Sequence, residues 1–412
     1  MKKILIITLL NCLITTLSFS QEKPKLVVGI VVDQMRYDYI YRFWDDFSDD
    51  GFKKLINEGH FFRNAQFGYV PTFTGPGHAS IYTGTTPSVH GIIANNWYDK
   101  TNGKSLYCSQ DDEMTTIGDT SSAGKMSPHN MLTSTFSDEL KLFNDGKVIG
   151  ISLKDRGAIL PAGHAGDAAY WMGSDGRWIS SSYYMNELPK YINDINNSNP
   201  AQNFLKGEWK VENEFTHNLS LMYATSGGSA IKKTPFGNTI LKDLAIEILQ
   251  KEKLCQGNTT DILTISFSST DYIGHQYGPH APEIKDTYIR LDNDISDLLN
   301  KIEKEIGFEN IVLFITADHG VVSEPKELLE RNIPAGYFDW TIMMTELKEL
   351  FNIKFGEGIW VKNYSNNQVF LNHDLINEKG LELEKVQQIC ATFLLKYEWV
   401  KNTYTSTQLH NH

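Results

Sequence analysis

Apolar residues along the chain form short continuous runs, separated by segments with helical spacing. Four runs rich in β-branched residues end beside polar or charged side chains, at residues 26–32, 148–153, 262–267 and 311–316. Runs of this length without alternation are typical of strands buried on both faces of a parallel sheet. The pattern therefore predicts four central strands of one sheet.

The intervening segments predict helices. From Pro282 to Ile306 the apolar residues recur at steps of three and four, and Gly307 supplies a stop signal. Shorter helices are predicted at residues 52–57, 74–82 and 238–250. Strands that alternate with helices predict an α/β fold, a doubly wound and mostly parallel sheet flanked by helices. Ligands of such folds bind beyond the carboxyl ends of the strands.

The chain of 412 residues is longer than one simple core usually spans. Two less regular segments, at about residues 165–215 and 335–402, account for the extra length. Two organisations fit, one elaborated domain with insertions or two separate domains. We interpret the two segments as insertions that cap the sheet, so that residues 21–412 form one domain.

Residues 1–20 have the pattern of a signal peptide. Two lysines precede a mostly apolar stretch, and Ser18-Phe19-Ser20 matches a small-x-small cleavage site. We therefore expect cleavage after Ser20 and a periplasmic or secreted protein, with no later apolar run long enough for a membrane span. The alternatives are a buried first strand, an uncleaved anchor and a lipoprotein signal at Cys12.

Charge and cysteine content narrow the class of protein. The formal net charge is −12, and removal of the two lysines of the signal segment makes it −14. An acidic surface repels phosphate backbones, which argues against nucleic acid as a partner. Cys108, Cys255 and Cys390 are widely spaced, match no zinc knuckle and permit at most one disulfide. We interpret them as structural residues.

Acidic residues and histidines gather at the predicted strand ends. Asp33 follows the first run, Asp271 lies just past the third with His275 four residues later, and Asp318 and His319 follow the fourth. Positions i and i+4 of a helical turn share a face, so Asp271 and His275 can bind one ion. Taken singly, each residue is more often a helix cap or a paired polar group. Together they form a carboxylate and imidazole set that zinc accepts.

Thr74 begins a Thr-Gly-Pro-Gly-His segment that is typical of a helix N-terminus. A capping role explains this pattern by itself. The same helix end also offers free N–H groups and a positive dipole end to a phosphate. A hydroxyl attacks poorly unless a bound divalent ion lowers its pKa, which for water falls from about 15.7 to about 7. Thr74 is therefore a candidate nucleophile that needs a metal.

Lys154 and Arg156 follow the second predicted strand. Residues i and i+2 of extended chain point to the same side, so both can reach one anion. Arginine offers a planar fork to phosphate oxygens, and lysine a point charge. Without the neighbouring motifs, the better interpretation of such a pair is a solvated loop.

Six motifs between about residues 25 and 320 resemble the alkaline phosphatase superfamily, most closely the periplasmic, phosphate-irrepressible alkaline phosphatases that use threonine. They are Val-Val-Asp33-Gln-Met-Arg, Thr-Phe-Thr74-Gly-Pro-Gly-His-Ala, Gly-Ile-Ile-Ala-Asn95-Asn-Trp-Tyr, Ser-Leu-Lys154-Asp-Arg156-Gly-Ala, Ser-Thr-Asp271-Tyr-Ile-Gly-His275 and Thr-Ala-Asp318-His319-Gly. They follow one another in the family's order, and the coincidence of all six is highly specific.

The resemblance implies two zinc ions, a phospho-threonine intermediate and small phosphate monoesters as substrates. The ligands it implies for the first zinc ion are Asp33, Thr74, Asp318 and His319. Those for the second are Asp271 and His275, and the residues implied for the phosphate oxygens are Asn95, Lys154 and Arg156. The second ion would serve the leaving group and later activate water.

Counting charges favours a monoester. Two zinc ions are balanced by three aspartates and a threonine alkoxide, so the lysine and arginine are left for a dianion, and a diester carries only one negative charge. A phosphodiesterase or nucleotide pyrophosphatase of the same superfamily is the nearest alternative. A sulfatase is disfavoured, because no Cys-x-Pro-x-Arg motif occurs.

The family's second zinc site takes one more histidine, from a segment well beyond Asp318 and His319. The later histidines are His373, His410 and His412, and none has that context. We therefore expect a chain that is truncated at its C-terminus, with an exposed sheet edge. We expect weak or no activity of this exact polypeptide and phosphatase activity of its full-length parent. An inactive phosphate-binding or metal-binding form is the alternative of a different class.

Overall fold

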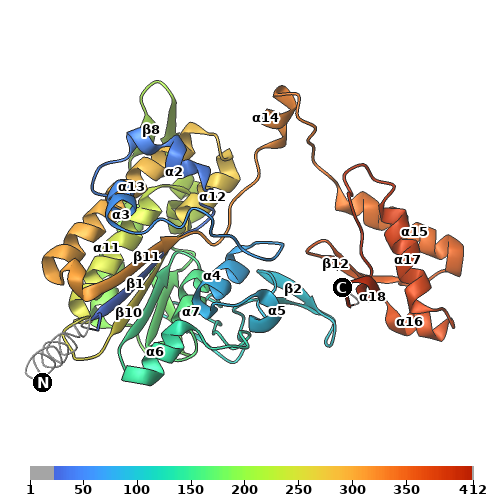
Figure 1. Cartoon of the computed structure of the whole chain (residues 1–412), viewed down its shortest axis with the longest axis horizontal. Helices are drawn as coiled ribbons and strands as arrows, with labels where there is room; N and C mark the ends of the chain where they lie inside the picture. The colour runs from blue at the N-terminus through green and yellow to red at the C-terminus, as the bar shows by residue number, and fades with distance from the viewer. Residues whose placement is uncertain (1–22, 411–412) are drawn as a thin grey trace, which may run out of the picture.

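The computed structural model describes residues 23–410, so the predicted signal peptide and His412 lie outside the described residues. A seven-stranded sheet with the order β11-β1-β10-β5-β6-β7-β4 forms the centre (Figure 1). The strands are β1 (Leu26–Val32), β4 (Thr116–Ile117), β5 (Val148–Ser152), β6 (Ala168–Met172), β7 (Trp178–Ser181), β10 (Asp261–Phe267) and β11 (Ile311–Thr316). The four strands predicted from apolar runs are confirmed.

The strands that carry the predicted ligands are parallel and in close register. β1 pairs with β10 and β11, and β10 pairs with β5, all in parallel. Val32 lies beside Phe267, Val31 beside Thr316, and Ser266 beside Ser152. Because these strands end at the same level, the residues that follow them meet at one edge of the sheet.

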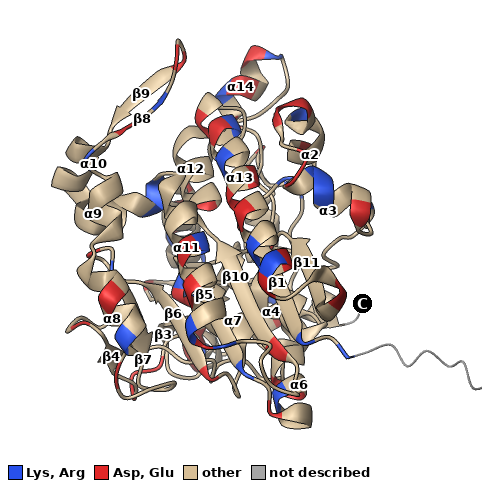
Figure 2. Ribbon diagram, turned by 90° about the vertical axis from the view of Figure 1, so that its left-hand side faces the viewer, with Lys and Arg blue, Asp and Glu red and all other residues tan. Residues whose placement is uncertain are grey.

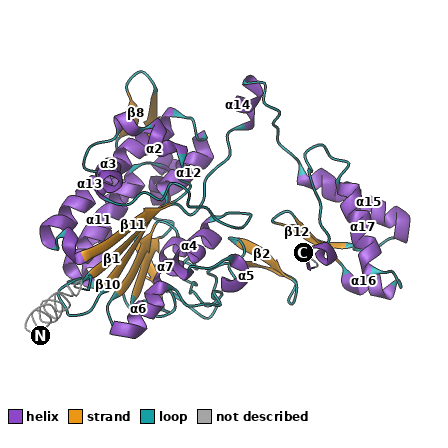
Figure 3. Ribbon diagram, viewed as in Figure 1, coloured by secondary structure: helices purple, strands orange, loops and turns teal. Residues whose placement is uncertain are grey.

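Helices cover both faces of the sheet, as Figure 3 shows. One layer contains α11 (Phe236–Lys251) and α13 (Pro282–Glu305), and the other contains α4 (Thr74–Thr83), α6 (Phe136–Asn144) and α7 (Asp155–Ala162). The helical stripe of α13 is buried, because residues such as Leu291, Ile295 and Leu298 face the core. Charges of both signs are spread along α8, α11 and α13 (Figure 2). The predicted α/β fold is confirmed.

The segment at residues 165–215 differs from a capping insertion in its first part. β6 and β7 extend the main sheet, since every residue of both strands is buried. Only the rest of the segment lies outside the sheet. It consists of α8 (Lys190–Asn197), α9 (Pro200–Phe204) and a hairpin of β8 (Glu208–Val211) and β9 (Phe215–Asn218).

The C-terminal residues form a unit with its own apolar core, built around Leu347, Phe351, Trp360 and Ile376. An extended arm with α14 (Pro325–Glu330) joins this unit to the sheet (Figure 1). Its elements are α15 (Trp340–Phe355), β12 (Val361–Ser365), β13 (Gln368–Leu371), α16 (His373–Glu378), α17 (Leu383–Leu394) and α18 (Ser406–His410).

The C-terminal unit contacts the main body at a hairpin of β2 (Asn96–Asp99) and β3 (Lys104–Tyr107). Asn366 Nδ2 donates a hydrogen bond of 2.8 Å to the carbonyl oxygen of Asn96. The rings of Tyr98 and Phe370 lie 4.9 Å apart. This β2–β3 hairpin therefore links the unit to the body.

The remaining described elements are short helices. They are α2 (Asp38–Arg42), η1 (Trp44–Asp46), α3 (Phe52–Glu58), α5 (Pro87–His90), α10 (Leu219–Ser226), η2 (Gly227–Lys233), α12 (Ser269–Tyr277) and η3 (Phe308–Asn310). Within residues 23–410, no helix combines the length and the apolar character that a membrane crossing requires. All three cysteines of this part of the chain are free thiols.

Candidate metal and phosphate site

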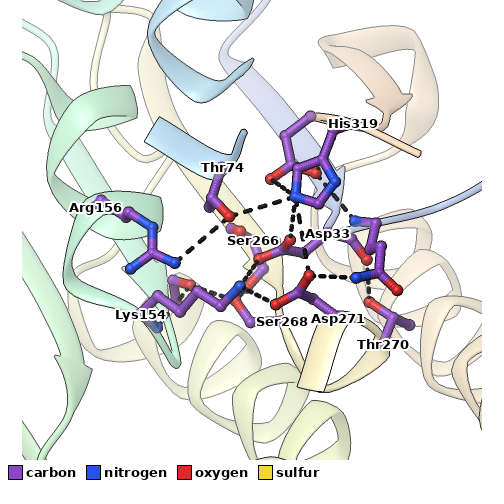
Figure 4. A network of polar contacts seen from close by, with 12 residues as sticks. Asp33, Thr74, Lys154, Arg156, Ser266, Ser268, Thr270, Asp271 and His319 are labelled. Atoms are coloured by element: carbon purple, nitrogen blue, oxygen red, sulfur yellow. Dashed lines mark hydrogen bonds and ion pairs between the residues drawn. The ribbon is translucent and has the colours of Figure 1, made fainter. Parts of the chain in front are cut away.

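The predicted residues come together at the carboxyl edge of the central strands (Figure 4). Asp33 follows β1, Asp318 and His319 follow β11, and Asp271 lies in α12, directly after β10. Lys154 and Arg156 follow β5 at the start of α7, and Thr74 is the first residue of α4.

Asp33, Asp271 and His319 form a group that can hold a metal ion. One donor atom from each residue lies within 4.8 Å of the others. His319 Nε2 is 3.4 Å from Asp33 Oδ1 and 3.9 Å from Asp271 Oδ1. Two carboxylates and an imidazole match the ligand preference of zinc and of related divalent ions.

Two buried carboxylate oxygens at this edge of the sheet have no hydrogen-bond partner among residues 23–410. They are Asp33 Oδ1 and Asp318 Oδ2, and both side chains are fully buried. A buried anionic oxygen without a partner is costly, and a bound cation removes that cost. Burial alone would raise the pKa of Asp318, but His319 and His78 lower it to about 2. The residues present therefore fit a divalent cation.

His275 lies beside this group but at its rim. The i, i+4 spacing on α12 places His275 Nε2 3.2 Å from Asp271 Oδ1, as predicted. The side chain of His275 is 70% exposed, in contrast to the buried group. His373 and His410 belong to α16 and α18 of the C-terminal unit. Figure 1 places those helices away from α12.

The hydroxyl of Thr74 faces the site and does not cap its helix. Phe73 occupies the N-cap position, and no side chain caps α4. Thr74 Oγ1 lies 3.4 Å from His319 Nε2 and 3.5 Å from Arg156 Nη2. The side chain is buried. Side-chain capping therefore does not explain the Thr-Gly-Pro pattern. The Thr74 hydroxyl instead lies between the candidate ligand His319 and the cationic side chain of Arg156.

The basic residues meet the acids and the hydroxyl. Lys154 Nζ lies 2.6 Å from Asp33 Oδ2 and 2.6 Å from Asp271 Oδ2. Burial alone would lower the pKa of Lys154, but the carboxylates of Asp33 and Asp271 outweigh it and keep the pKa above its usual value. Arg156 turns one nitrogen of its fork toward Thr74. This edge of the sheet thus combines carboxylates that can bind a metal with two cationic side chains.

Asn95 reaches the start of α4. Its Oδ1 accepts a hydrogen bond of 2.7 Å from the backbone N–H of Gly75. Asn95 directly precedes the β2–β3 hairpin. The residue predicted to contact phosphate therefore lies next to Thr74.

Two further residues of the site were not singled out from the sequence. Gln34, with a φ of 65°, donates its backbone N–H to Asp318 Oδ1 at 3.1 Å and its Nε2 to Asp271 Oδ1 at 2.7 Å. His78 lies 2.8 Å from the carbonyl oxygen of Thr74 through Nδ1, and 3.4 Å from Asp318 Oδ2. The available signal was position: Gln34 follows Asp33, and His78 stands one helical turn after Thr74.

With this fold and this site, the chain belongs to the type I phosphodiesterase / nucleotide pyrophosphatase family, whose model matches residues 27–404. Within the alkaline phosphatase superfamily it is a homologue of the PafA-type enzymes. It is 38% identical to alkaline phosphatase PafA of Elizabethkingia meningoseptica, over 91% of this chain and 74% of that protein. It is 41% identical to a Myroides odoratus protein named calcium-transporting ATPase, over 92% of this chain and 75% of that protein.

A crystal structure of wild-type PafA matches the fold. The TM-score is 0.90 at 37% identity, and the match covers 95% of this chain and 80% of that chain. The predicted family and the predicted α/β architecture are thereby confirmed.

Proposed function

We propose that this protein hydrolyses phosphate monoesters and that Thr74 is its nucleophile. The observation that carries the proposal is the position of Thr74 Oγ1, between His319 Nε2 at 3.4 Å and Arg156 Nη2 at 3.5 Å, beside a buried acidic group. The resemblance to proteins named alkaline phosphatases supports phosphate esters as the substrate class.

The proposed metal is zinc, with two ions in a complete site. The proposed ligands of the first ion are Asp33, Thr74, Asp318 and His319, and those of the second include Asp271 and His275. The unpartnered oxygens of Asp33 and Asp318 support this assignment. When bound, the ions would lower the pKa of the Thr74 hydroxyl and offset negative charge on the phosphate.

The side chains suggest the course of the reaction. Arg156, Lys154 and Asn95 bind the non-bridging phosphate oxygens and orient the phosphorus toward Thr74. The threonine oxygen, after losing its proton to solvent, forms a bond to phosphorus while the bond to the alcohol oxygen breaks. The leaving oxygen keeps the electron pair and takes a proton from water. A water molecule then attacks the phospho-threonine, which releases inorganic phosphate and restores Thr74.

Monoester preference depends on the second basic charge, and Arg156→Ala tests it. We expect the wild-type protein to cleave p-nitrophenyl phosphate with a higher kcat/KM than methyl p-nitrophenyl phosphate. The variant should lose about 10- to 100-fold with the monoester, the scale of a hydrogen bond between charged groups, and less with the diester. Steady-state kinetics with both esters give the ratio.

A diesterase is the second candidate, because the matching family is described by phosphodiesterases and nucleotide pyrophosphatases. It is favoured if the diester is the better substrate and if Arg156→Ala lowers cleavage of both esters equally. Reversal of the wild-type preference would therefore move the proposal to that class.

Metal affinity should rise with pH. Burial alone would lower the pKa of His319, but Asp318 and Asp33 outweigh it and raise the pKa to about 9. In the metal-free protein, the proton on His319 stabilises the fold, and this contribution is fully present below a pH of about 6.5. This contribution is lost as the pH rises through about 9.

A metal needs neutral imidazole and must displace that proton. The apparent affinity should therefore increase by about tenfold per pH unit up to pH of about 9, and then level off. Chelator competition between pH 6 and 10 measures it. A flat profile from pH 7 to 9 contradicts a ligand role for His319.

We also propose export, on the N-terminal pattern alone. It implies that the mature protein begins at Gln21. N-terminal sequencing of the protein recovered from its host tests this.

A further inference from the structure

The base of the β2–β3 hairpin brings a tyrosine to the site. Asn96 and Tyr107 are paired across the two strands, and the N–H of Cys108 donates to the carbonyl oxygen of Asn95 at 2.9 Å. Asn95 and Tyr107 therefore lie side by side at the base of the hairpin. Asn95 meets the start of the nucleophile helix, and Tyr107 meets Arg156.

The hydroxyl of Tyr107 has a defined direction. It donates its single proton to Asp155 Oδ1, and it accepts a hydrogen bond of 3.0 Å from Arg156 Nη1. Because the proton is directed to Asp155, a lone pair is left for the arginine. Burial raises the pKa of Tyr107 well above its usual value, and Asp155 raises it further, so the hydroxyl keeps this proton.

Arg156 depends on this contact for its orientation. Among the described residues its side chain makes two hydrogen bonds, from Nη1 to Tyr107 and from Nη2 to Thr74 Oγ1, and its buried Nε has no partner. The guanidinium also lies over the Tyr107 ring, 6.0 Å from its centre. The Thr74 contact, at 3.5 Å, is the longer of the two. The hydrogen bond to Tyr107 is therefore the main contact that sets the orientation of the Arg156 guanidinium.

We propose that Tyr107 is a positioning residue, whose hydroxyl, held by Asp155, directs the Arg156 fork toward the phosphate bound beside Thr74. This inference rests on the proposed role of Arg156 in phosphate binding. Tyr107 itself does not touch the reacting atoms. Its effect should appear wherever Arg156 acts, and nowhere else.

The test is the substitution Tyr107→Phe, which removes the hydroxyl and keeps the ring. We expect kcat/KM for p-nitrophenyl phosphate to fall by about tenfold, mainly through KM, and the inhibition constant of inorganic phosphate to rise by a similar factor. The effect should vanish when Arg156 is absent. In an Arg156→Ala background, Tyr107→Phe should change kcat/KM by less than about twofold.

Tyr98→Phe is the matched control. Tyr98 lies on the same hairpin, and its hydroxyl makes no hydrogen bond within residues 23–410. This variant should change kcat/KM by less than about twofold. Arg156→Lys replaces the alanine variant in the double substitution if Arg156→Ala does not fold.

Each result has a distinct meaning. Loss of activity by Tyr107→Phe that disappears in the Arg156 background supports the proposal. An unchanged Tyr107→Phe variant, or a loss of the same size in both backgrounds, overturns it and leaves the proposed hydrolase intact. An Arg156→Ala variant with wild-type kinetics overturns both this inference and the proposed phosphate-binding role.

Discussion

Thr74→Ala is expected to lower kcat for phosphate monoesters by about 10⁴-fold or more relative to the unchanged chain, on the scale seen when other enzymes lose a nucleophile. The reason is geometric and chemical. The Thr74 hydroxyl is buried at the start of α4, between His319 and the Arg156 fork. No other hydroxyl of α4 shares that position. Ser80 and Thr83 make hydrogen bonds elsewhere, and the hydroxyl of Tyr82 lies beside Gly29 of β1. Alanine is compatible with the helix and removes the attacking oxygen, together with the γ-methyl group of threonine.

The measurement is steady-state turnover together with mass spectrometry of acid-quenched protein. Wild-type protein should show a phosphate adduct on Thr74, and the variant none. Thr74→Ser keeps a hydroxyl and should retain part of the activity. Thr83→Ala is the matched control, because Thr83 lies on the same helix and donates to the carbonyl of Ala79 at 2.7 Å.

The same experiment separates an enzyme from a phosphate binder. If Thr74→Ala keeps kcat within tenfold of wild type, the nucleophile lies elsewhere. If wild-type protein binds phosphate without any turnover, the binding form is the correct description.

Asp33→Asn is expected to lower metal affinity by about 100-fold or more, beyond the 10- to 100-fold typical of losing a residue that only supports a ligand. Asp33 is fully buried at the end of β1. Its Oδ2 is paired with Lys154, and its Oδ1 has no hydrogen-bond partner in the part of the chain that the structure describes. Asparagine has nearly the same shape but no charge. The group would therefore lose a negative charge that balances the cation.

Zinc content after dialysis against a buffered zinc concentration measures this effect. Asp292→Asn is a matched control for burial, because Asp292 is a buried residue of α13 that accepts hydrogen bonds from Ser48 and Phe52. It should lower Tm and leave zinc content unchanged. Equal zinc content in the Asp33→Asn variant and wild type, with both folded, would falsify the ligand assignment.

Local sequence patterns predicted the strands and helices that carry the site. Parallel strands end together, so an acid after each run, such as Asp33 or Asp318, was expected at one edge of the sheet. From the sequence, β6 was predicted to lie in an insertion. Its place in the sheet depends on pairing with β5, and the local pattern of residues in β6 does not reveal that pairing. The separate core of the C-terminal unit likewise depends on long-range packing.

Side-chain partners were the least predictable part of the site. The positive φ of Gln34 is a tertiary constraint that a glutamine does not signal. The ion pairs of Lys154 with Asp33 and Asp271 connect residues that follow three different strands. The contact of Tyr107 with Arg156 joins a hairpin to a helix, and no local period encodes it.

The β2–β3 hairpin is held from two sides. Its base supports residues proposed to face the phosphate, and its outer part contacts the C-terminal unit through the Asn366–Asn96 hydrogen bond and the contact of Phe370 with Tyr98. Positions 366 and 370 are therefore connected to Arg156 along one ribbon of paired strands. Two residues that never approach a substrate are thus connected to the proposed phosphate site by an unbroken series of contacts.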